Sequence, residues 1–299
     1  MSMGQGLLVT VTPNPSLDRF CSPGTLELGR LNRLGEVTTR AGGKGINVAR
    51  AANAAGCGCR IISTAGGAGG AALGKLLERE RLAYEFVPVA GETRINLKVS
   101  CGGVFTEFNE AGPRADSSTA DRLCEALERC LGNGRERDGA MCAAFCGSLP
   151  PGFPPDGYAR LIHTARACGA YTVLDADGEA LRRGLEAVPD LIKPNADELA
   201  GLFGELGAPP ERLRELARVA VERGMARAVL CSLGAGGAFY LSRELYVHEA
   251  ALPVRGIATT VGAGDALLGG FLSARLHKAS RQDALRTGVR AAANQIEQK

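Results

Sequence analysis

An aspartate next to two glycines near the end of the chain is the strongest candidate for chemistry. Residues Thr259–Asp265 read T-T-V-G-A-G-D and lead directly into the run ALLGGFLSARL. Gly262, Ala263 and Gly264 at the start of an amphipathic helix would leave backbone N–H groups facing a ligand, and such a pocket can hold a developing phosphoryl charge. Asp265 at its edge could accept a proton from an attacking hydroxyl. The alternative is an ordinary N-cap, which Asp fills routinely.

A second glycine cluster opens another predicted helix. Residues 41–50 read A-G-G-K-G-I-N-V-A-R, with Asn47 in the first turn. Gly42 and Gly43 permit the close approach of a ligand, and Lys44 supplies a point charge suited to phosphate. The alternative is a glycine-rich loop with a solvated lysine, and this stretch taken alone favours that interpretation.

Two further loops follow predicted strands. Lys193–Leu199 reads K-P-N-A-D-E-L, and Asn195 and Glu198 within it are three residues apart. This is the spacing of a capping box and also of an oxygen pair able to hold a hydrated magnesium ion, and the spacing alone favours the capping box. Ser232–Ala238 reads S-L-G-A-G-G-A and predicts either a hairpin turn or a loop at the edge of a nucleotide site.

The functional interpretation of the four loops is favoured because the loops occur together in one chain. All of them fall at strand-to-helix or strand-to-strand junctions, and ligands of open α/β sheets bind at the carboxyl ends of strands. Together they offer cations, a carboxylate base, an anion pocket and a metal-capable pair, which are the parts that phosphoryl transfer needs without a Walker loop. Asp18 and Arg94, taken singly, are ordinary surface charges.

The elements that must position these loops are predicted from hydrophobic periodicity. From residue 118 onward strand follows helix regularly, which predicts βαβ units and a parallel sheet covered by helices on both faces. Strands are predicted at residues 7–12, 60–64, 86–89, 95–100, 104–108, 141–146, 171–174, 191–193, 228–232 and 238–241. Helices are predicted at 45–55, 71–81, 118–131, 156–168, 180–185, 197–203, 211–223, 265–276 and 281–298.

Two segments break this rhythm. Residues 18–41 show mixed alternation and no helical period, and residues 94–110 predict a hairpin that turns at Gly102 and Gly103. We expect both segments to form a small antiparallel sheet that stands off the main body as a lid. No internal repeat or low-complexity linker interrupts the sequence, so we predict one domain over residues 1–299 with this lid attached.

Composition excludes several classes of protein. With 45% hydrophobic and 22% charged residues the chain of 299 residues is globular, and a net charge of +3 without a long basic run disfavours binding to nucleic acid or a membrane surface. No window of the sequence reaches the roughly 18 to 20 apolar residues of a membrane span.

The ten cysteines contain no C-x-x-C pair, and the three histidines lack the spacing of metal ligands, so neither disulfides nor zinc is predicted. The start lacks the features of a signal peptide, and we expect free thiols in a reducing cytoplasm.

The ordered set of motifs resembles the phosphofructokinase-B branch of the ribokinase-like sugar kinases over nearly the whole chain. The motifs are T-P-N-P-S-L-D (12–18), A-G-G-K-G-I-N-V-A-R (41–50), T-R-I-N (93–96), G-S-L-P-P-G (147–152), K-P-N-A-D-E-L (193–199), S-L-G-A-G-G-A (232–238) and T-V-G-A-G-D (260–265). Within that branch the stretches A-G-G-K-G-I-N-V-A-R, G-E-T-R-I-N-L-K and F-N-E-A-G-P are most similar to 1-phosphofructokinases, with tagatose-6-phosphate kinases next. The resemblance implies a three-layer α/β/α sandwich with a mostly parallel central sheet and a small antiparallel β lid.

The resemblance also implies roles for the candidate residues. Asp265 would deprotonate the acceptor hydroxyl while the amides of Gly262, Ala263 and Gly264 hold the transferring phosphoryl group. Lys44 and Arg94 would grip the phosphate already on the substrate. The sugar hydroxyls would be bound by Asp18, by the backbone of Gly42 and Gly43, and by Asn47.

The remaining candidates are implied to serve the nucleotide and the metal. Asn195 and Glu198 would organise magnesium, and Lys193 would contact the nucleotide phosphates. The adenine and ribose would be bordered by Ser232, Gly234, Gly237 and Asn294.

The implied activity is the ATP-dependent conversion of fructose 1-phosphate to fructose 1,6-bisphosphate. ATP is the co-substrate and Mg²⁺ the cofactor, a monovalent cation is a further candidate, and a homodimer is expected to form through the lid. Tagatose 6-phosphate and fructose 6-phosphate are the alternative substrates, and a non-catalytic sensor of sugar phosphate or nucleotide is the alternative of another class. A nicotinamide-dependent oxidoreductase is disfavoured because no strand-to-helix turn carries a complete G-x-G-x-x-G.

Overall fold

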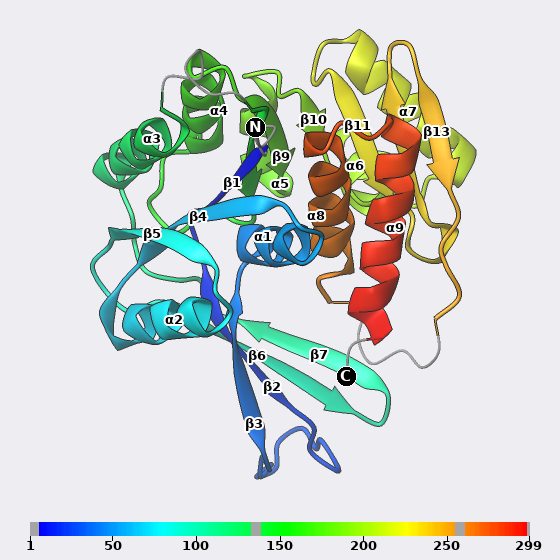
Figure 1. Cartoon of the computed structure of the whole chain (residues 1–299). Coiled ribbons are helices and arrows are strands. Elements are labelled where there is room, and N and C mark those ends of the chain that lie inside the picture. Colours follow the sequence, from blue (N-terminus) through cyan, green and yellow to red (C-terminus); the bar gives the residue numbers. More distant parts are fainter. Residues whose placement is uncertain (1–5, 133–138, 255–260, 298–299) are drawn as a thin grey trace.

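A computed structural model describes residues 6–132, 139–254 and 261–297 of the chain. A large sheet with helices on both faces forms the body, and a smaller sheet projects from one end of it (Figure 1). Thr259 and Thr260, which begin the predicted phosphate loop, lie outside the described residues.

The central sheet is mostly parallel, as the sequence predicts. Within the described residues it has nine strands in the order β13-β12-β11-β10-β9-β8-β1-β4-β5. Pairing is parallel from β5 to β11, and β12 and β13 close one edge in antiparallel pairing. The strands are β1 (Leu7–Thr12), β4 (Gly58–Ala65), β5 (Ala83–Pro88), β8 (Met141–Cys146), β9 (Tyr171–Asp175), β10 (Leu191–Ile192), β11 (Ala228–Ser232), β12 (Ala238–Ser242) and β13 (Tyr246–Glu249). Strand β13 was not predicted, because it has only four residues and none of them is fully buried.

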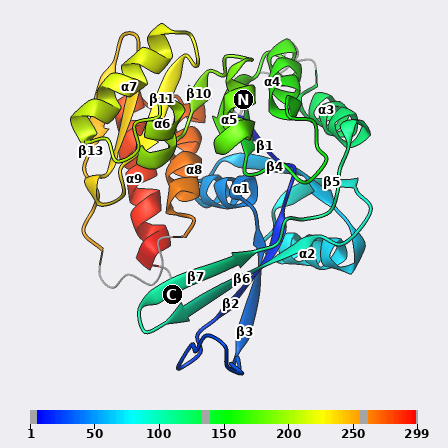
Figure 2. The same cartoon turned by 180° about the vertical axis from the view of Figure 1, so that it is seen from behind.

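Two helical layers cover the sheet, which confirms the three-layer sandwich (Figures 1 and 2). One layer holds α1 (Lys44–Ala54), α2 (Gly67–Arg79), α8 (Ala263–Leu276) and α9 (Arg281–Glu297). The other holds α3 (Ser117–Leu131), α4 (Gly157–Ala167), α5 (Gly178–Leu185), α6 (Ala196–Leu202) and α7 (Pro210–Glu222). Successive side chains of a strand point to opposite faces, so in β1 Val9 and Val11 enter one core and Leu8 enters the other.

The lid contains four strands in the order β3-β2-β6-β7. They are β2 (Ser16–Cys21), β3 (Val37–Gly42), β6 (Arg94–Cys101) and β7 (Val104–Asn109). The β2–β3 and β6–β7 pairs are antiparallel as predicted, but the central β2–β6 pair is parallel. The reason is that β2 and β6 follow β1 and β5, two parallel body strands, so both enter the lid in the same direction.

Several element boundaries differ from the predicted ones. Helix α2 begins at Gly67, four residues before the predicted start. Its first four residues read GAGG, and they were not predicted as helical because glycine has a low helix propensity.

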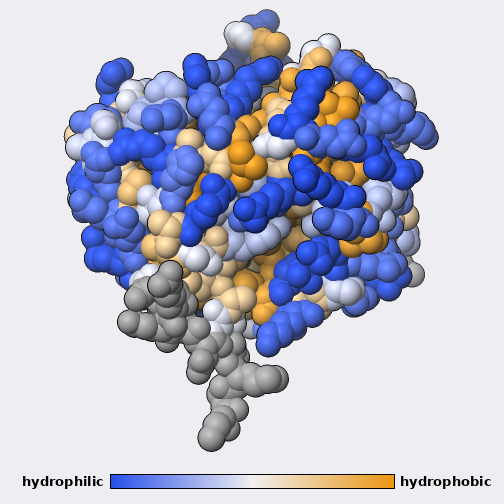
Figure 3. Space-filling model, turned by 90° about the horizontal axis from the view of Figure 1, so that it is seen from above, coloured by the Kyte–Doolittle hydropathy of each residue, from blue (hydrophilic) through white to orange (hydrophobic). Residues whose placement is uncertain are grey.

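Within the described residues, no helix is both long and apolar enough to span a membrane, and no disulfide joins two cysteines. The end of the molecule away from the lid is largely hydrophilic, with apolar residues visible between the polar ones (Figure 3).

Helices α1 and α8 approach each other closely at Gly269. A Cβ atom built on Gly269 would lie 2.5 Å from the carbonyl oxygen of Val48 and 2.7 Å from the Cβ of Ala51. A glycine is therefore needed at this crossing, which brings together the first turns of the two helices that carry Lys44 and Asp265.

Replacing Gly269 by alanine tests this helix contact. The added methyl group must push α1 and α8 apart, so we expect the free energy of unfolding to fall by about 1–3 kcal/mol, although alanine favours the helix. The matched control is Gly201→Ala on α6, where the nearest atom to a built Cβ lies 3.7 Å away on Leu206. That variant should be neutral, or more stable by up to about 1 kcal/mol. Urea unfolding followed by circular dichroism measures both, and equal losses would contradict the prediction.

Candidate active site

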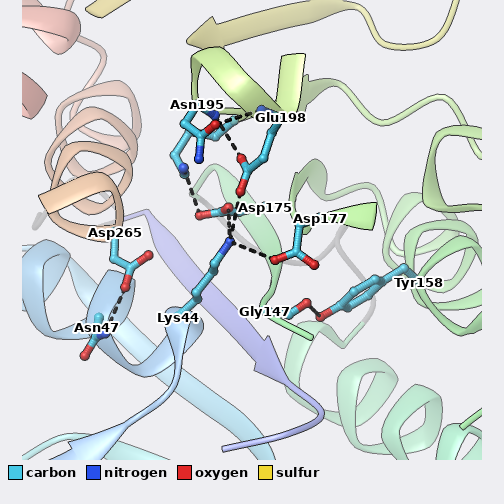
Figure 4. A network of polar contacts seen from close by, with 10 residues as sticks. Lys44, Asn47, Gly147, Tyr158, Asp175, Asp177, Asn195, Glu198 and Asp265 are labelled. Atoms are coloured by element: carbon cyan, nitrogen blue, oxygen red, sulfur yellow. Dashed lines mark hydrogen bonds and ion pairs between the residues drawn. The ribbon is translucent and has the colours of Figure 1, made fainter. Parts of the chain in front are cut away.

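The candidate residues lie where the carboxyl ends of the body strands face the lid. Asp175 ends β9, Lys193 directly follows β10, and Lys44 and Asp265 stand in the first turns of α1 and α8. Figure 4 shows the side chains of Lys44, Asp175 and Asp265 directed toward a common centre. The structure thus brings together residues that are up to 221 positions apart in the sequence.

Asp265 is not the N-cap of its helix. Helix α8 begins at Ala263, and its N-cap is Gly262, whose φ of 79° is left-handed and favours glycine. Among the described residues no side chain caps this helix, so its first amides are open to a ligand. The Asp265 side chain instead accepts a 2.8 Å hydrogen bond from Nδ2 of Asn47. The N-cap interpretation of Asp265 is therefore wrong.

The environment of Asp265 makes its carboxylate more basic than usual. Burial and the negative charge of Asp175 raise the pKa of Asp265 to about 6, and the hydrogen bond from Asn47 and the charges of Lys193 and Lys44 oppose this rise. A carboxyl group with a pKa near 6 is mostly ionised at neutral pH and still accepts protons better than an ordinary Asp. That is the property a general base requires.

Asp175 holds two lysines beside this carboxylate. It is fully buried, with Oδ1 3.3 Å from Nζ of Lys44 and Oδ2 3.4 Å from Nζ of Lys193. Lys44 Nζ also lies 3.7 Å from Oε1 of Glu198 and 4.0 Å from Oδ2 of Asp177 (Figure 4). Asp175 is the largest cause of the raised pKa of Lys44. Burial lowers the pKa of Lys193, but the surrounding carboxylates, Asp175 foremost, outweigh it and the net shift is upward. The interpretation of Lys44 as a solvated lysine is therefore wrong.

Asn195 and Glu198 form the capping box of α6. Asn195 Oδ1 accepts a hydrogen bond from the Glu198 amide at 2.8 Å, and Glu198 Oε2 accepts one from the Asn195 amide at 2.9 Å. The second carboxylate oxygen of Glu198 faces Lys44 instead. The capping box therefore leaves one oxygen of Glu198 directed into the charged cluster.

Oxygen donors in this cluster suit magnesium. Asp175 Oδ2 is buried and accepts no hydrogen bond from the described residues, although Lys193 Nζ lies 3.4 Å away, and Glu198 Oε1 belongs to the same network. In the described part of the chain no group of three or more His, Cys, Asp and Glu residues is arranged to hold a metal ion. Magnesium needs no such group, because it usually keeps several waters and binds one or two carboxylates together with substrate phosphates.

Asp18 is buried in the lid rather than exposed. Its Oδ1 accepts hydrogen bonds from Ser16 Oγ at 2.7 Å and from Asn96 Nδ2 at 3.2 Å, and its Oδ2 lies 2.9 Å from Nζ of Lys98. A Cβ on Gly42 would lie 2.3 Å from Asp18 Oδ1, so only glycine fits at that position. Gly43 is the N-cap of α1 and has a positive φ. The glycine loop and Asp18 are therefore in direct contact.

Arg94 lies at the base of the lid. Its guanidinium donates to the carbonyl oxygens of Asn14 and Glu110, both at 3.0 Å, and burial lowers its pKa. Asn14 in turn donates to Ser148 Oγ at 3.3 Å. Lys44 pairs with carboxylates of the body and Arg94 with carbonyls of the lid base, so the two cations expected to share one phosphate have different partners.

A cavity of about 850 Å³ adjoins the first turn of α8. Ser232, Gly234 and Gly237 line it together with Gly264, as the sequence analysis expects. Its other side is apolar and is formed by Ala251, Leu252, Pro253, Val254, Leu267, Val289, Ala292, Ala293 and Ile296. The volume is in the range of small-molecule sites.

Asn294 does not line this cavity, contrary to expectation. Helix α9 presents Val289, Ala292, Ala293 and Ile296 to it, which is the i, i+3, i+4, i+7 stripe of one helix face. Asn294 falls outside that stripe and is exposed.

Several residues of the site were missed in the sequence analysis. Asp175 could have been found, because it ends the buried run YTVLD at the carboxyl end of a strand. Asn96 and Lys98 alternate with apolar residues in β6, and nothing in the sequence marked them as functional. Their contact with Asp18 depends on the parallel pairing of β2 and β6.

Comparison with known proteins agrees with this geometry. The model of the pfkB family of carbohydrate kinases matches residues 19–299. The chain belongs to this family. Two curated relatives are named 1-phosphofructokinase: the one from Bacillus subtilis is 33% identical and the one from Haloferax volcanii 36% identical, each over 95% of this chain and over 90% and 88% of their own lengths.

Solved structures of the same family share the fold. Phosphofructokinase-2 from Escherichia coli in complex with potassium superposes with a TM-score of 0.89 at 30% identity and covers 99% of this chain and 94% of its own. The tetrameric inhibited form of that enzyme gives a TM-score of 0.89 at 31% identity, with 98% and 94% covered. These matches confirm the family and the ribokinase-like fold that the motifs imply.

The ionisation of Asp265 can be measured by NMR on protein with ¹³C-labelled aspartate carboxyls, with Asp265→Asn to assign the signal. We expect the Asp265 carboxyl to titrate near pH 6. Asn47→Ala removes the hydrogen bond that favours the charged form, so the pKa should rise above that value. Asn53→Ala, at the exposed end of the same helix, is the control. An unchanged or lower pKa in Asn47→Ala would contradict this account.

Proposed function

We propose that this chain is an ATP-dependent kinase that phosphorylates fructose 1-phosphate to fructose 1,6-bisphosphate. The observation that carries the proposal is the buried carboxylate of Asp265, which Asn47 holds at the open N-terminus of α8 beside two lysines. The relatives from B. subtilis and H. volcanii, both named 1-phosphofructokinase, support the choice of substrate.

Asp265 takes the proton from the acceptor hydroxyl of the sugar. Its pKa near 6 keeps it ionised and basic at neutral pH. The amides of Gly262, Ala263 and Gly264 at the start of α8 then stabilise the negative charge of the transferring phosphoryl group. Asn47 orients the carboxylate through its hydrogen bond to Oδ2.

Binding of the sugar involves the lid and the glycine loop. Asp18 and the backbone of Gly42 and Gly43 bind its hydroxyls, because the glycines let the sugar approach the buried carboxylate closely. Arg94 binds the phosphate that the sugar already carries, with its planar guanidinium suited to bidentate contact.

The nucleotide lies in the cavity beside α8. Ser232, Gly234 and Gly237 border its base and ribose, and Lys193 neutralises its phosphates. We also assign Lys44 to this side rather than to the sugar phosphate, because it shares Asp175 with Lys193.

Magnesium is held by Glu198, with Asn195 and Asp175 as further oxygen donors. When bound, the ion neutralises charge on the nucleotide phosphates. In the structure Lys44 and Lys193 both pair with Asp175, and Lys44 also lies near Glu198. A monovalent cation remains a second candidate, since the E. coli phosphofructokinase-2 has been crystallised with potassium.

A substrate panel tests the proposed activity. Coupled ADP release is measured with fructose 1-phosphate, fructose 6-phosphate and tagatose 6-phosphate, and fructose 1-phosphate should give the highest kcat/KM. Asp265→Asn should lower kcat by about 10²- to 10⁴-fold or more, because a loss of this size is typical when a general base is removed. Binding without turnover would favour a sensor, and a preference for another sugar phosphate would refute the specific assignment. Unchanged turnover in Asp265→Asn would show that Asp265 is not the general base.

We further propose that two chains associate through the lid. Val37, Val104 and Phe108 are exposed, by 40%, 65% and 54%. The strand registers place all three on the face of the lid opposite to Asp18. An exposed apolar row on a projecting sheet is a favourable surface for burial against a second copy.

Sedimentation of a charged variant tests this association. Val104→Glu places a carboxylate in the apolar row and should shift the chain toward monomer in analytical ultracentrifugation. Leu206→Glu is the matched control, because Leu206 is 75% exposed on the body, away from the lid. A wild-type monomer, or a Val104→Glu variant that associates as the wild type does, would overturn the lid interface. Tetramers, as in the inhibited form of the E. coli enzyme, would mean that a further interface exists.

A further inference from the structure

Lys98 is a buried charge that none of the assigned roles uses. It lies on lid strand β6 and is only 6% exposed. A buried ammonium is costly unless it is paired, and within the described residues its one ion pair is with Asp18, at 2.9 Å. A lysine placed there only to stabilise the lid could be replaced by an apolar residue, so its position calls for another explanation.

The ammonium of Lys98 is directed toward the sugar site. In the sheet register Lys98 stands opposite Glu107 of β7 and opposite Phe20 of β2, while Asp18 stands opposite Asn96. Lys98 forms its ion pair with buried Asp18 and not with Glu107, the exposed carboxylate directly across from it. It also lies 5.4 Å from the centre of the Phe20 ring. The side chain thus leans along the strand toward the base of the lid, where Arg94 lies.

The surroundings of the pair contain polar atoms without partners. Asn96 Oδ1 is buried and accepts no hydrogen bond, although Nδ2 of the same residue donates to Asp18 and Ser16. Arg94 Nε and Asn14 Oδ1 are likewise buried and have no hydrogen-bond partner among the described residues. Buried polar atoms are normally satisfied, so these atoms are consistent with a polar ligand that binds at the base of the lid.

We propose that Lys98 recognises the phosphate of the sugar substrate together with Arg94. This inference rests on the proposed sugar-phosphate kinase function. In the structure Asp18 pairs with Lys98. When the sugar binds, its hydroxyls donate to Asp18 in place of the ammonium, and Lys98 turns to the phosphate.

Charge balance supports this exchange of partners. A phosphate monoester carries about −1.5 to −2 charges near neutral pH. Arg94 and a Lys98 released from Asp18 supply two positive charges on one face of β6, because residues of even spacing along a strand share a face. Lys44 cannot take this role without leaving Asp175, Asp177 and Glu198. The flexible stem of a lysine allows the movement that a rigid guanidinium would not.

The main test is Lys98→Gln, because its amide can still donate to Asp18 while the charge is lost. We expect the KM for fructose 1-phosphate to rise at least about tenfold with kcat and the KM for ATP nearly unchanged, as for a contact made equally in ground and transition states. Lys98→Arg should recover part of the affinity. Lys75→Met, at an exposed lysine of α2, is the control for loss of a cation and should behave as the wild type.

Calorimetric titration with fructose 1-phosphate measures the same contact without turnover. In Lys98→Gln the Kd should be raised and should depend less on ionic strength than in the wild type, because one charge contact is missing. If the protein binds the sugar phosphate but transfers no phosphoryl group, the proposed kinase activity is wrong. The calorimetric comparison of the wild type with Lys98→Gln still tests whether Lys98 contacts the phosphate. Wild-type affinity in Lys98→Gln, or a fall in kcat at unchanged KM, would overturn the inference, since the latter is what misalignment of Asp18 predicts. Lys98→Met serves if the glutamine variant does not fold.

Discussion

The site depends on one buried carboxylate. Asp175 is completely enclosed at the end of β9, yet it bears a negative charge because Lys44 and Lys193 approach it from two different elements. Removing Asp175 would leave the buried Lys193 without the carboxylate that it pairs with, which is far more costly than never having buried the pair. Burial and, after it, this same charge raise the pKa of Asp265. A single aspartate therefore pairs with two cations and also contributes to the basicity of the neighbouring acid.

Much of the architecture could be predicted from sequence because it follows from local pattern. The run MCAAFC in β8 is apolar at every position and is buried at every position, as a central parallel strand should be. The glycine-rich opening of α8 was likewise predicted, although the helix begins at Ala263, two residues before the predicted start. Asn294 could have been placed correctly too, because the apolar stripe of α9 excludes it.

The contacts that could not be predicted are those made across the sheet or between layers. The sequence around Lys44 favours a solvated side chain, and only the fold brings Asp175 to it across 131 positions. The parallel pairing of β2 with β6 has the same origin, because it reflects the body strands from which the lid emerges. Lys98 could not be recognised as a candidate from the sequence, where it is one polar residue in a predicted hairpin. Only the parallel register of β2 and β6 shows that it lies beside Asp18.

The root of the lid has a mechanical consequence. Between β1 and β2 the chain passes through Pro13-Asn14-Pro15, and Thr64 Oγ1 donates to the Pro13 carbonyl while Arg94 holds that of Asn14. Two prolines and two anchored carbonyls leave no free hinge at this junction. These contacts therefore set the direction in which this segment leaves the body, and reorienting the lid at this junction would require both carbonyl hydrogen bonds to break.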